Sequence, residues 1–185
     1  MTTIVALSGS LRKGSLNTAL LRVAQQLCPA GVTLDLHTLH GIPLYDGDVE
    51  AQGLPEAVRK LGDAIVAADG LLIGTPEYNH SIPGVLKNGL DWVSRPSGSG
   101  ARIFGGKPTA VIGATPGGGG TMRSQDALLH VLRAFGSDVW FGPWLTLSHA
   151  PSLFNAEGEL TDEKTRDMLR SFIAGFAQRI QARKA

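Results

Sequence analysis

Two polar segments of the sequence combine residue types that suit a phosphate and a flat ring. The first reads Ser8-Gly9-Ser10-Leu11-Arg12-Lys13-Gly14-Ser15 and continues into a stretch of helical period. Hydroxyls, an arginine and free backbone N–H groups at the beginning of a helix favour a phosphate dianion. The segment lacks the Gly-Lys-Ser/Thr of a nucleotide-hydrolase P-loop and the G-x-G-x-x-G of a dinucleotide-binding fold. A helix capped by Ser15, with Arg12 and Lys13 in solvent, is the alternative interpretation.

The second segment places two prolines around a polar, aromatic tip. It reads Thr75-Pro76-Glu77-Tyr78-Asn79-His80-Ser81-Ile82-Pro83. Since proline fixes φ, the segment would hold its backbone donors and acceptors rigidly against a flat heterocycle. A rigid surface turn is the alternative interpretation. In either case Ser81 could cap the helix that follows.

Apolar runs bounded by turn residues alternate with segments of helical period, which indicates repeated strand–helix units. Nearly continuous apolar runs predict three central strands that helices cover on both faces. These strands are residues 3–7, 70–73 and 109–112. Residues 32–39 alternate between apolar and polar side chains, which predicts an edge strand. The last strand, at residues 139–147, contains Pro143, which cannot donate to a strand ladder and is restricted to edges or bulges.

Five amphipathic helices would cover this sheet. They are predicted at residues 16–27, from about Pro55, from about Pro83, at residues 123–135 and at residues 162–182. Right-handed crossovers, with strand two at one edge and strand five at the other, give the order 2-1-3-4-5. This is the α/β, flavodoxin-like fold with a doubly wound five-stranded parallel sheet. Residues 1–185 would form a single domain, and the glycine- and serine-rich residues 94–106 a long surface loop.

The strand order also predicts where a ligand would bind. In an open parallel sheet the site lies beyond the carboxyl ends of the strands, where the strand order reverses, here between strands one and three. The loops at residues 8–17, 75–81 and 115–121 meet at this point. For the first loop, this position favours a phosphate-binding loop over a helix that is merely capped by Ser15.

Composition restricts the partners and the compartment. Seventeen basic and 16 acidic residues among 185 give a formal net charge of +1, with no run of like charges. We therefore expect neither a nucleic acid nor a membrane as partner. The N-terminus lacks a basic region followed by a long apolar stretch, which favours a cytoplasmic protein. Cys28 is the only cysteine, so an intrachain disulfide is excluded and a buried, inert thiol is expected.

The motifs G-S-L-R-K-G-S-L-N and P-E-Y-N-H-S-I-P-G-V-L-K-N-x-L-D-W resemble those of the NADPH-dependent FMN reductase family. That family includes quinone and chromate reductases and some azoreductases. The resemblance covers nearly the whole chain, with five strand–helix units in the family's order. It implies FMN as cofactor and NADPH or NADH as electron donor. The acceptor would be a small molecule such as a quinone, a flavin, an azo or nitro compound, or a metal oxyanion.

The resemblance also implies which residues bind FMN. The phosphate would contact Ser10, Arg12, Ser15, Leu16, Asn17 and Thr18. The isoalloxazine ring would contact Pro76, Glu77, Tyr78 and Asn79, largely through backbone groups. The pyrimidine end of the ring would border Thr115, Pro116, Gly117 and Gly118. His80 stands where the family tolerates different residues.

Under this interpretation FMN carries the chemistry, and the protein supplies position and electrostatics. NAD(P)H would give a hydride to the flavin and leave before the acceptor binds on the same face, in a ping-pong scheme. We assign no catalytic side chain. The remaining histidines, His37, His40, His130 and His149, lack metal-ligand spacing and are predicted as surface or packing residues.

Two other functions on the same fold are the alternatives. One is a non-enzymatic electron carrier, and the other is a module that senses flavin or redox state without turnover. Flavodoxin-type carriers tend to be acidic and to bind phosphate through hydroxyls. This chain is nearly neutral and places Arg12 in the first loop, which favours the reductase.

Members of the family complete the flavin pocket across a subunit boundary, so the resemblance implies a homodimer or homotetramer. Trp92, near the end of the third predicted helix, would suit the core of such an interface. More generally, Trp92, Trp140 and Trp144 are predicted as core or subunit-contact residues.

Overall fold

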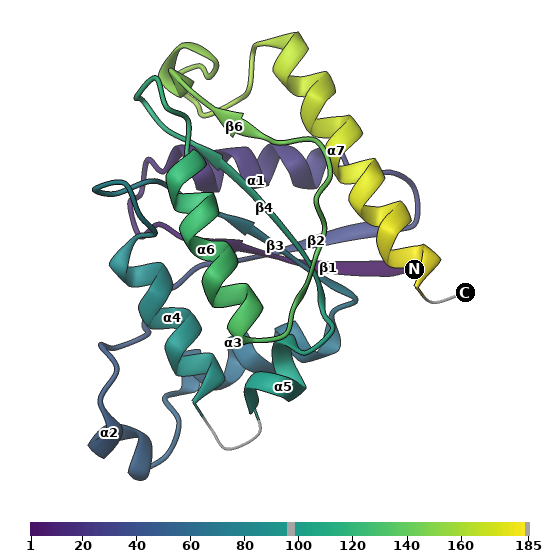
Figure 1. Ribbon diagram of the computed structural model, residues 1–185. Coiled ribbons are helices and arrows are strands. Elements are labelled where there is room, and N and C mark those ends of the chain that lie inside the picture. The colour runs from purple at the N-terminus through teal and green to yellow at the C-terminus, as the bar shows by residue number, and fades with distance from the viewer. Residues whose placement is uncertain (96–98, 184–185) are drawn as a thin grey trace.

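The structure, a computed structural model, describes residues 1–95 and 99–183. Its parallel sheet has the predicted order β2-β1-β3-β4-β5 (Figure 1). These strands are β2 (Val32–His37), β1 (Thr2–Ser8), β3 (Gly70–Gly74), β4 (Pro108–Ala114) and β5 (Asp138–Val139). In the register of the sheet, Ile4 of β1 lies beside Leu34 on one side and Gly70 on the other. The predicted flavodoxin-like fold is confirmed.

Helices cover both faces of the sheet (Figure 1). On one face α1 (Leu16–Gln26) and α7 (Glu163–Ala182) bury their apolar side chains against residues such as Ile4 and Ile112. The other face, with residues such as Val5 and Ile73, is covered by four helices. These are α3 (Glu56–Ala67), α4 (Gly84–Ser94), α5 (Ser99–Phe104) and α6 (Met122–Ala134). The short α2 (Gly47–Ala51) lies away from the sheet.

Local sequence explains the edge strand and the beginnings of two helices. Along β2, Val32 and Leu34 are buried while Thr33 and Asp35 are exposed, so the alternation predicted for an edge strand is confirmed. Ser15 caps α1, because its hydroxyl accepts from the Thr18 N–H at 3.2 Å. The carboxylate of Asp162 caps α7 in the same way, accepting from the Thr165 N–H at 2.8 Å. A hydrogen bond with the Thr165 side chain, together with this backbone bond, lowers the pKa of Asp162.

The single edge strand predicted over residues 139–147 is wrong. The chain instead forms β5 and a second short strand, β6 (Thr146–Leu147), and both pair with β4. The Trp140 N–H still donates to the Thr109 carbonyl, and the Gly113 N–H donates to the Leu145 carbonyl where pairing resumes. The residues between leave the sheet, and they include Pro143, which has no N–H to donate.

The surface loop predicted over residues 94–106 is also wrong for its second half, where α5 lies. Ile103 and Phe104 are buried against the face covered by α3 and α4. The Phe104 ring stacks on the Phe135 ring with centroids 4.5 Å apart. Glycine and serine content misled the prediction, since the apolar pair is what anchors this helix. Residues 96–98 lie outside the described residues.

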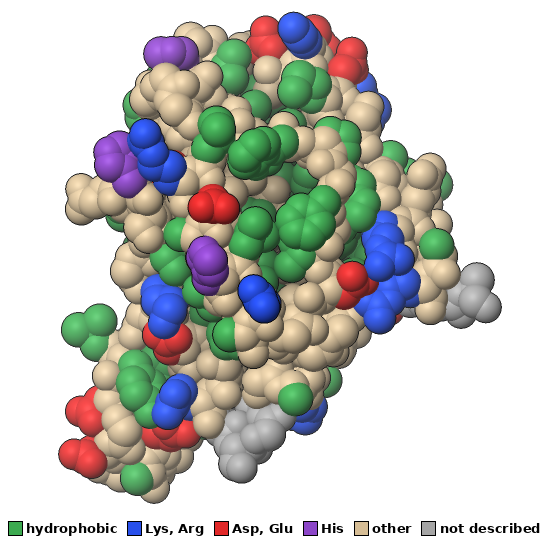
Figure 2. Space-filling view, viewed as in Figure 1, with side chains coloured by type: hydrophobic (Ala, Val, Ile, Leu, Met, Phe, Trp, Pro, Cys, Tyr) green, Lys and Arg blue, Asp and Glu red, His purple; other side chains and the backbone are tan. Residues whose placement is uncertain are grey.

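Trp92 is fully buried within one chain, which confirms it as a core residue and contradicts its prediction as the core of a subunit interface. Its indole N–H donates to the Pro43 carbonyl at 2.9 Å. Trp140 is partly buried and packs against Phe172 and Phe176, whereas Trp144 is 61% exposed. Trp140 and Trp144 line an apolar cavity of about 310 Å³, and hydrophobic side chains gather on this face of the molecule (Figure 2).

Cys28 is partly buried rather than fully buried. Its thiol donates to the Ala24 carbonyl at 3.5 Å, and burial raises the pKa of the thiol. No helix among the described residues is long and apolar enough to cross a membrane.

Candidate functional site

Three loops follow the carboxyl ends of β1, β3 and β4, at the end of the sheet opposite the chain termini (Figure 1). The first loop contacts the last residue of β3 through backbone, because the Gly9 N–H donates to the Gly74 carbonyl at 2.8 Å. A Cβ at Gly9 would lie 3.0 Å from Leu86 Cδ2 and 3.1 Å from that carbonyl oxygen. A side chain at Gly9 would force its neighbours to move by a few tenths of an ångström, so glycine suits this close approach to the end of β3.

The first loop presents donors that the chain itself does not use. The Arg12 guanidinium is exposed and makes no ion pair or hydrogen bond within the described residues. The hydroxyls of Ser10 and Ser15 accept from backbone N–H groups, so each keeps its proton available to donate. Helix geometry leaves the first-turn N–H groups of Leu16 and Asn17 without intrahelical acceptors. This set of donors fits a phosphate dianion at a helix N-terminus.

Two residues predicted to contact the phosphate use their side chains to hold the scaffold. The Asn17 carboxamide donates to the Ala114 carbonyl at 2.8 Å and accepts from the Ala114 N–H at 2.9 Å. The Thr18 hydroxyl lies 2.7 Å from the Ser8 hydroxyl. Both residues are buried. Their side chains therefore fix the start of α1 against the sheet, and the backbone N–H of Asn17 remains the group available to a ligand.

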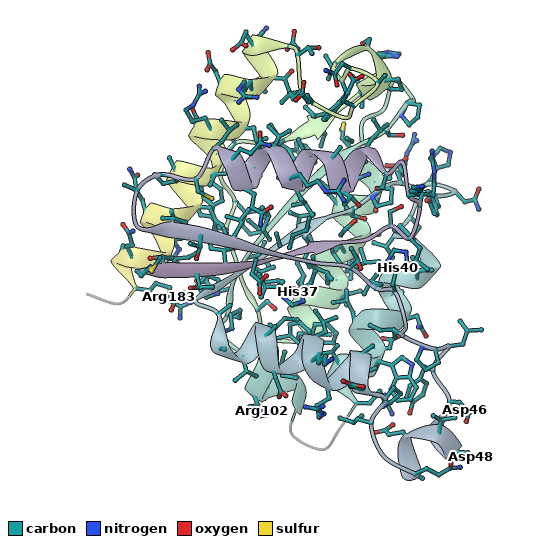
Figure 3. The ribbon with its side chains drawn as sticks, turned by 180° about the vertical axis from the view of Figure 1, so that it is seen from behind. His37, His40, Asp46, Asp48, Arg102 and Arg183 are labelled. Atoms are coloured by element: carbon teal, nitrogen blue, oxygen red, sulfur yellow. The ribbon has the colours of Figure 1, made fainter. Side chains whose placement is uncertain are left out.

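His40, predicted as a surface or packing residue, contacts the backbone of the first loop. Its Nε2 lies 3.2 Å from the Leu11 carbonyl oxygen, and its Nδ1 lies 3.0 Å from the Thr38 hydroxyl. Figure 3 shows His40 at the end of the sheet where the loops gather. The sequence carries no signal for this contact, because Leu11 and His40 are 29 positions apart.

The second loop forms a tight hairpin. Tyr78 and Ser81 exchange backbone hydrogen bonds of 3.0 and 3.1 Å around Asn79 and His80. The two central residues have φ of 51° and 63°, the left-handed backbone of a type I′ turn. The predicted cap by Ser81 is wrong, because α4 begins after Pro83 without a side-chain cap. Ser81 instead closes the hairpin.

The Glu77 carboxylate joins the hairpin to the N-terminus of α6. One of its carboxylate oxygens accepts from the N–H groups of Arg123 and Ser124, at 3.0 and 3.2 Å. The Ser124 hydroxyl also donates to the Pro76 carbonyl at 2.9 Å and lies 2.8 Å from the Thr75 hydroxyl. A negative charge at a helix N-terminus is favourable. The second loop is therefore fastened to the first turn of α6.

Backbone hydrogen bonds join the third loop to the end of β6 and the segment that follows it. The Thr115 N–H donates to the Leu147 carbonyl at 2.9 Å, and the His149 N–H donates to the Gly117 carbonyl at 3.2 Å. Pro116, Gly117 and Gly118 are exposed. His149, predicted as a surface or packing residue, is indeed exposed but lies against this loop with a left-handed φ of 48°.

The fold thus brings the predicted residues of all three loops to one end of the sheet. The site offers phosphate donors on one side and rigid backbone on the other, and a bound FMN fits this arrangement. Among the described residues, no group of His, Cys, Asp and Glu could hold a metal ion. The apolar cavity near Trp140 receives no lining residue from these loops, so it is a separate feature.

Together, the strand order and the three loops at the carboxyl end of the sheet define a protein of flavodoxin-like fold. The chain matches the family described as NADPH-dependent FMN reductase over residues 2–152. It is 44% identical over 167 residues to an NAD(P)H-dependent FMN reductase of Pseudomonas aeruginosa, covering 90% of this chain and 89% of the relative. It is also 39% identical to a 2-hydroxy-1,4-benzoquinone reductase of Burkholderia sp., covering 98% of this chain and 97% of the relative.

A solved structure supports the same grouping. The flavoenzyme NAD(P)H:(acceptor) oxidoreductase FerB of Paracoccus denitrificans superposes with a TM-score of 0.86 at 38% identity, covering 98% of each chain. The chain belongs to the NADPH-dependent FMN reductase family. It is an oxidoreductase that uses FMN with NADPH or NADH as electron donor and a small molecule as acceptor.

The hydrogen bonds from α6 to the Glu77 carboxylate predict that replacing Glu77 lowers the stability of the protein. The Glu77 side chain is only 12% exposed, so its replacement by Ala leaves two helix N–H groups without their acceptor. A hydrogen bond to a charged group contributes about 1.5–3 kcal/mol. Because both N–H groups share one carboxylate oxygen, we expect the free energy of unfolding to decrease by about this amount in total. Denaturant unfolding of the flavin-free protein measures it.

Two further variants make the comparison specific. Glu77→Gln keeps an acceptor oxygen and should lose less than Glu77→Ala. Glu157→Ala, at an exposed carboxylate outside the site, should stay within about 0.5 kcal/mol of the unmodified protein. Equal stability of Glu77→Ala and Glu157→Ala would contradict the capping role.

Proposed function

We propose that this single-domain enzyme, residues 1–185, reduces a quinone with electrons from NADPH or NADH through FMN bound at the three loops. The observation that carries the proposal is the convergence of unused donors in the first loop, namely Arg12, the hydroxyls of Ser10 and Ser15 and the first-turn N–H groups of α1. They lie at the point where the strand order reverses.

The FMN phosphate would lie on the first turn of α1. Ser10 and Ser15 would donate through their hydroxyls, Arg12 through its guanidinium, and Leu16 and Asn17 through their backbone N–H groups. Thr18 would support the phosphate site indirectly, because its N–H donates to the Ser15 hydroxyl and its own hydroxyl contacts that of Ser8. These bonds keep the Ser15 hydroxyl oriented before FMN binds.

The isoalloxazine ring would lie between the second and third loops. Pro76, Glu77, Tyr78 and Asn79 would contact it through backbone, since the Glu77 carboxylate is engaged with α6. At the other end Thr115, Pro116, Gly117 and Gly118 would border the pyrimidine ring. Both loops are fixed by hydrogen bonds to other elements, which reduces the ordering entropy lost on binding.

Bound FMN supplies the hydride chemistry, taking two electrons from the nicotinamide and delivering them to the acceptor. The protein's own residues bind the ring and leave one face open, so donor and acceptor would use that face in turn, in a ping-pong scheme. A quinone is the acceptor we favour, because relatives of 36–39% identity are named as quinone reductases. Flavins, azo and nitro compounds and metal oxyanions remain candidates for the same open face.

Steady-state turnover tests the proposed function. The FMN-loaded protein should oxidise NADPH or NADH continuously when 1,4-benzoquinone is present, with one hydroquinone formed per nicotinamide oxidised. Rates measured against both substrates should give parallel double-reciprocal lines, as a ping-pong scheme requires. Absence of turnover with either nicotinamide would contradict the reductase, and intersecting lines would contradict the ping-pong order.

Replacement of Arg12 tests the phosphate loop. Arg12→Ala removes a hydrogen bond between charged groups, typically about 1.5–3 kcal/mol, so FMN affinity should fall roughly ten- to a hundredfold. Riboflavin lacks the phosphate and should bind Arg12→Ala as well as it binds the unmodified protein. Fluorescence titration of both apoproteins with each flavin measures these affinities.

Lys13→Ala is the matched control for Arg12, because the neighbouring cation is also exposed but is not assigned to the phosphate. Its FMN affinity should change by less than about threefold, as expected for an exposed charge outside the contact. Equal FMN affinities for Arg12→Ala and the unmodified protein would refute the assignment, as would an equal loss of riboflavin affinity.

We also propose that the protein is a homodimer or homotetramer. The support is the family resemblance together with large apolar side chains that remain exposed on a single chain, such as Phe141 at 79% and Trp144 at 61%. Figure 2 shows hydrophobic side chains gathered on that face. Light scattering should give at least twice the chain mass of 19.5 kDa. A monomeric mass, both with and without FMN, would contradict the proposal.

A further inference from the structure

We propose that Arg123, with His80 beside it, binds the 2′-phosphate of NADPH and so makes NADPH the preferred donor over NADH. This rests on the proposed function, since the donor must approach the ring held by the second loop. The proposal assigns a role to two residues that FMN binding does not use. It also names the group that distinguishes the two nicotinamide donors.

Arg123 and His80 lie together at the outer side of the ring loop. Arg123 is in the first turn of α6, and its Nη1 lies 2.8 Å from His80 Nδ1 at the tip of the hairpin. Both side chains are exposed. With Nδ1 accepting from the guanidinium, the proton of a neutral His80 is on Nε2. The pair therefore retains several N–H donors for an anion.

The guanidinium of Arg123 makes no ion pair with a carboxylate of the described residues. Glu77 lies beside His80, with Oε1 3.4 Å from His80 Nδ1, and its other oxygen accepts from two N–H groups of α6. Its side chain is also largely buried. Within the described part of the chain, Arg123 has no ion-pair partner. An incoming dianion would therefore meet a guanidinium that no carboxylate of the described residues pairs with directly.

Other cations near the second loop already have partners or roles. Lys87 pairs with Asp91 at 2.7 Å, and the Arg95 guanidinium lies over the Tyr45 ring, 5.3 Å from its centroid. Arg12 is assigned to the FMN phosphate. Among the described residues, Arg123 is thus the cation at the first turn of α6, beside the ring loop, that has no other assigned partner or role.

The length of a dinucleotide favours NADPH, rather than an anionic electron acceptor, as the ligand of Arg123 and His80. A quinone is no larger than the ring it must cover, so it can receive electrons without touching α6. A dinucleotide extends well beyond the ring, and its adenosine 2′-phosphate must lie at some distance from the nicotinamide. A guanidinium matches a phosphate monoester through two parallel hydrogen bonds. The outer side of the ring loop is where such a distant group would be recognised.

The test compares donor preference with direct binding of the phosphate-bearing fragment. The ratio of kcat/KM for NADPH to kcat/KM for NADH should fall about ten- to a hundredfold in Arg123→Ala. Arg123→Lys should retain part of the preference, because it keeps the charge and loses the fork. His80→Asn, which tolerates the left-handed backbone, should give a smaller decrease than Arg123→Ala.

Calorimetry provides a readout that does not depend on turnover. Adenosine 2′,5′-bisphosphate should bind the FMN-loaded protein more tightly than adenosine 5′-monophosphate does, and Arg123→Ala should abolish the difference. Arg133→Ala is the matched control, since it removes an exposed arginine from the last turn of the same helix. It should change neither readout.

The outcomes separate this inference from the proposed function. Lack of turnover with both donors would overturn the proposed function. Turnover with both donors, but with an unchanged preference in Arg123→Ala, would overturn the role of Arg123 alone. Equal losses for NADPH and NADH, or equal binding of the two adenosine nucleotides to the unmodified protein, would overturn it as well.

Discussion

Two hydrogen bonds between the Asn17 carboxamide and the backbone of Ala114 hold the start of α1 against the end of β4. Both groups are buried, so removal of one partner would leave the other unsatisfied, at a cost of about 1–3 kcal/mol per group. Because the third loop begins immediately after Ala114, this contact fixes the first loop relative to the third. The donors for a phosphate and the backbone beside a ring are thereby held at a constant separation before any ligand binds.

The second loop depends on a different element. Its hairpin contains two non-glycine residues in the left-handed region, Asn79 and His80, a conformation that surrounding contacts must maintain. Those contacts come from α6, through the Glu77 carboxylate and the Ser124 hydroxyl. The first turn of α6 and the hairpin are therefore joined directly by hydrogen bonds. A ligand that binds to Arg123 would contact the same pair of elements that is proposed to hold the ring.

The sequence predicts the strands whose burial pattern is local and misses the contacts that join distant segments. The central strands and the half-exposed β2 follow from periodicity alone, and Ser15 caps α1 as its position suggested. The cap of α6 could not be predicted, because its acceptor, Glu77, lies 46 positions before Arg123. The interruption between β5 and β6 depends on pairing with β4, which the local sequence does not reveal. The candidate phosphate donors of the first loop could be predicted, because in the sequence they stand between the end of one strand and the start of a helix.

The third loop shows how a ligand can be inferred from a sequence feature that folding does not require. A Cβ at Gly113, in β4, would lie 2.4 Å from the Thr75 carbonyl oxygen, so the packing of the sheet itself demands glycine there. At Gly117 the φ angle is ordinary and the nearest atom to a Cβ would be Thr115 Oγ1, 4.0 Å away. The fold would therefore accept a side chain at this position, and replacing glycine by alanine where the backbone permits it stabilises a protein. The absence of a side chain at Gly117 is explained if a flat ligand lies against the backbone of the loop, which is where the pyrimidine end of FMN is proposed to lie.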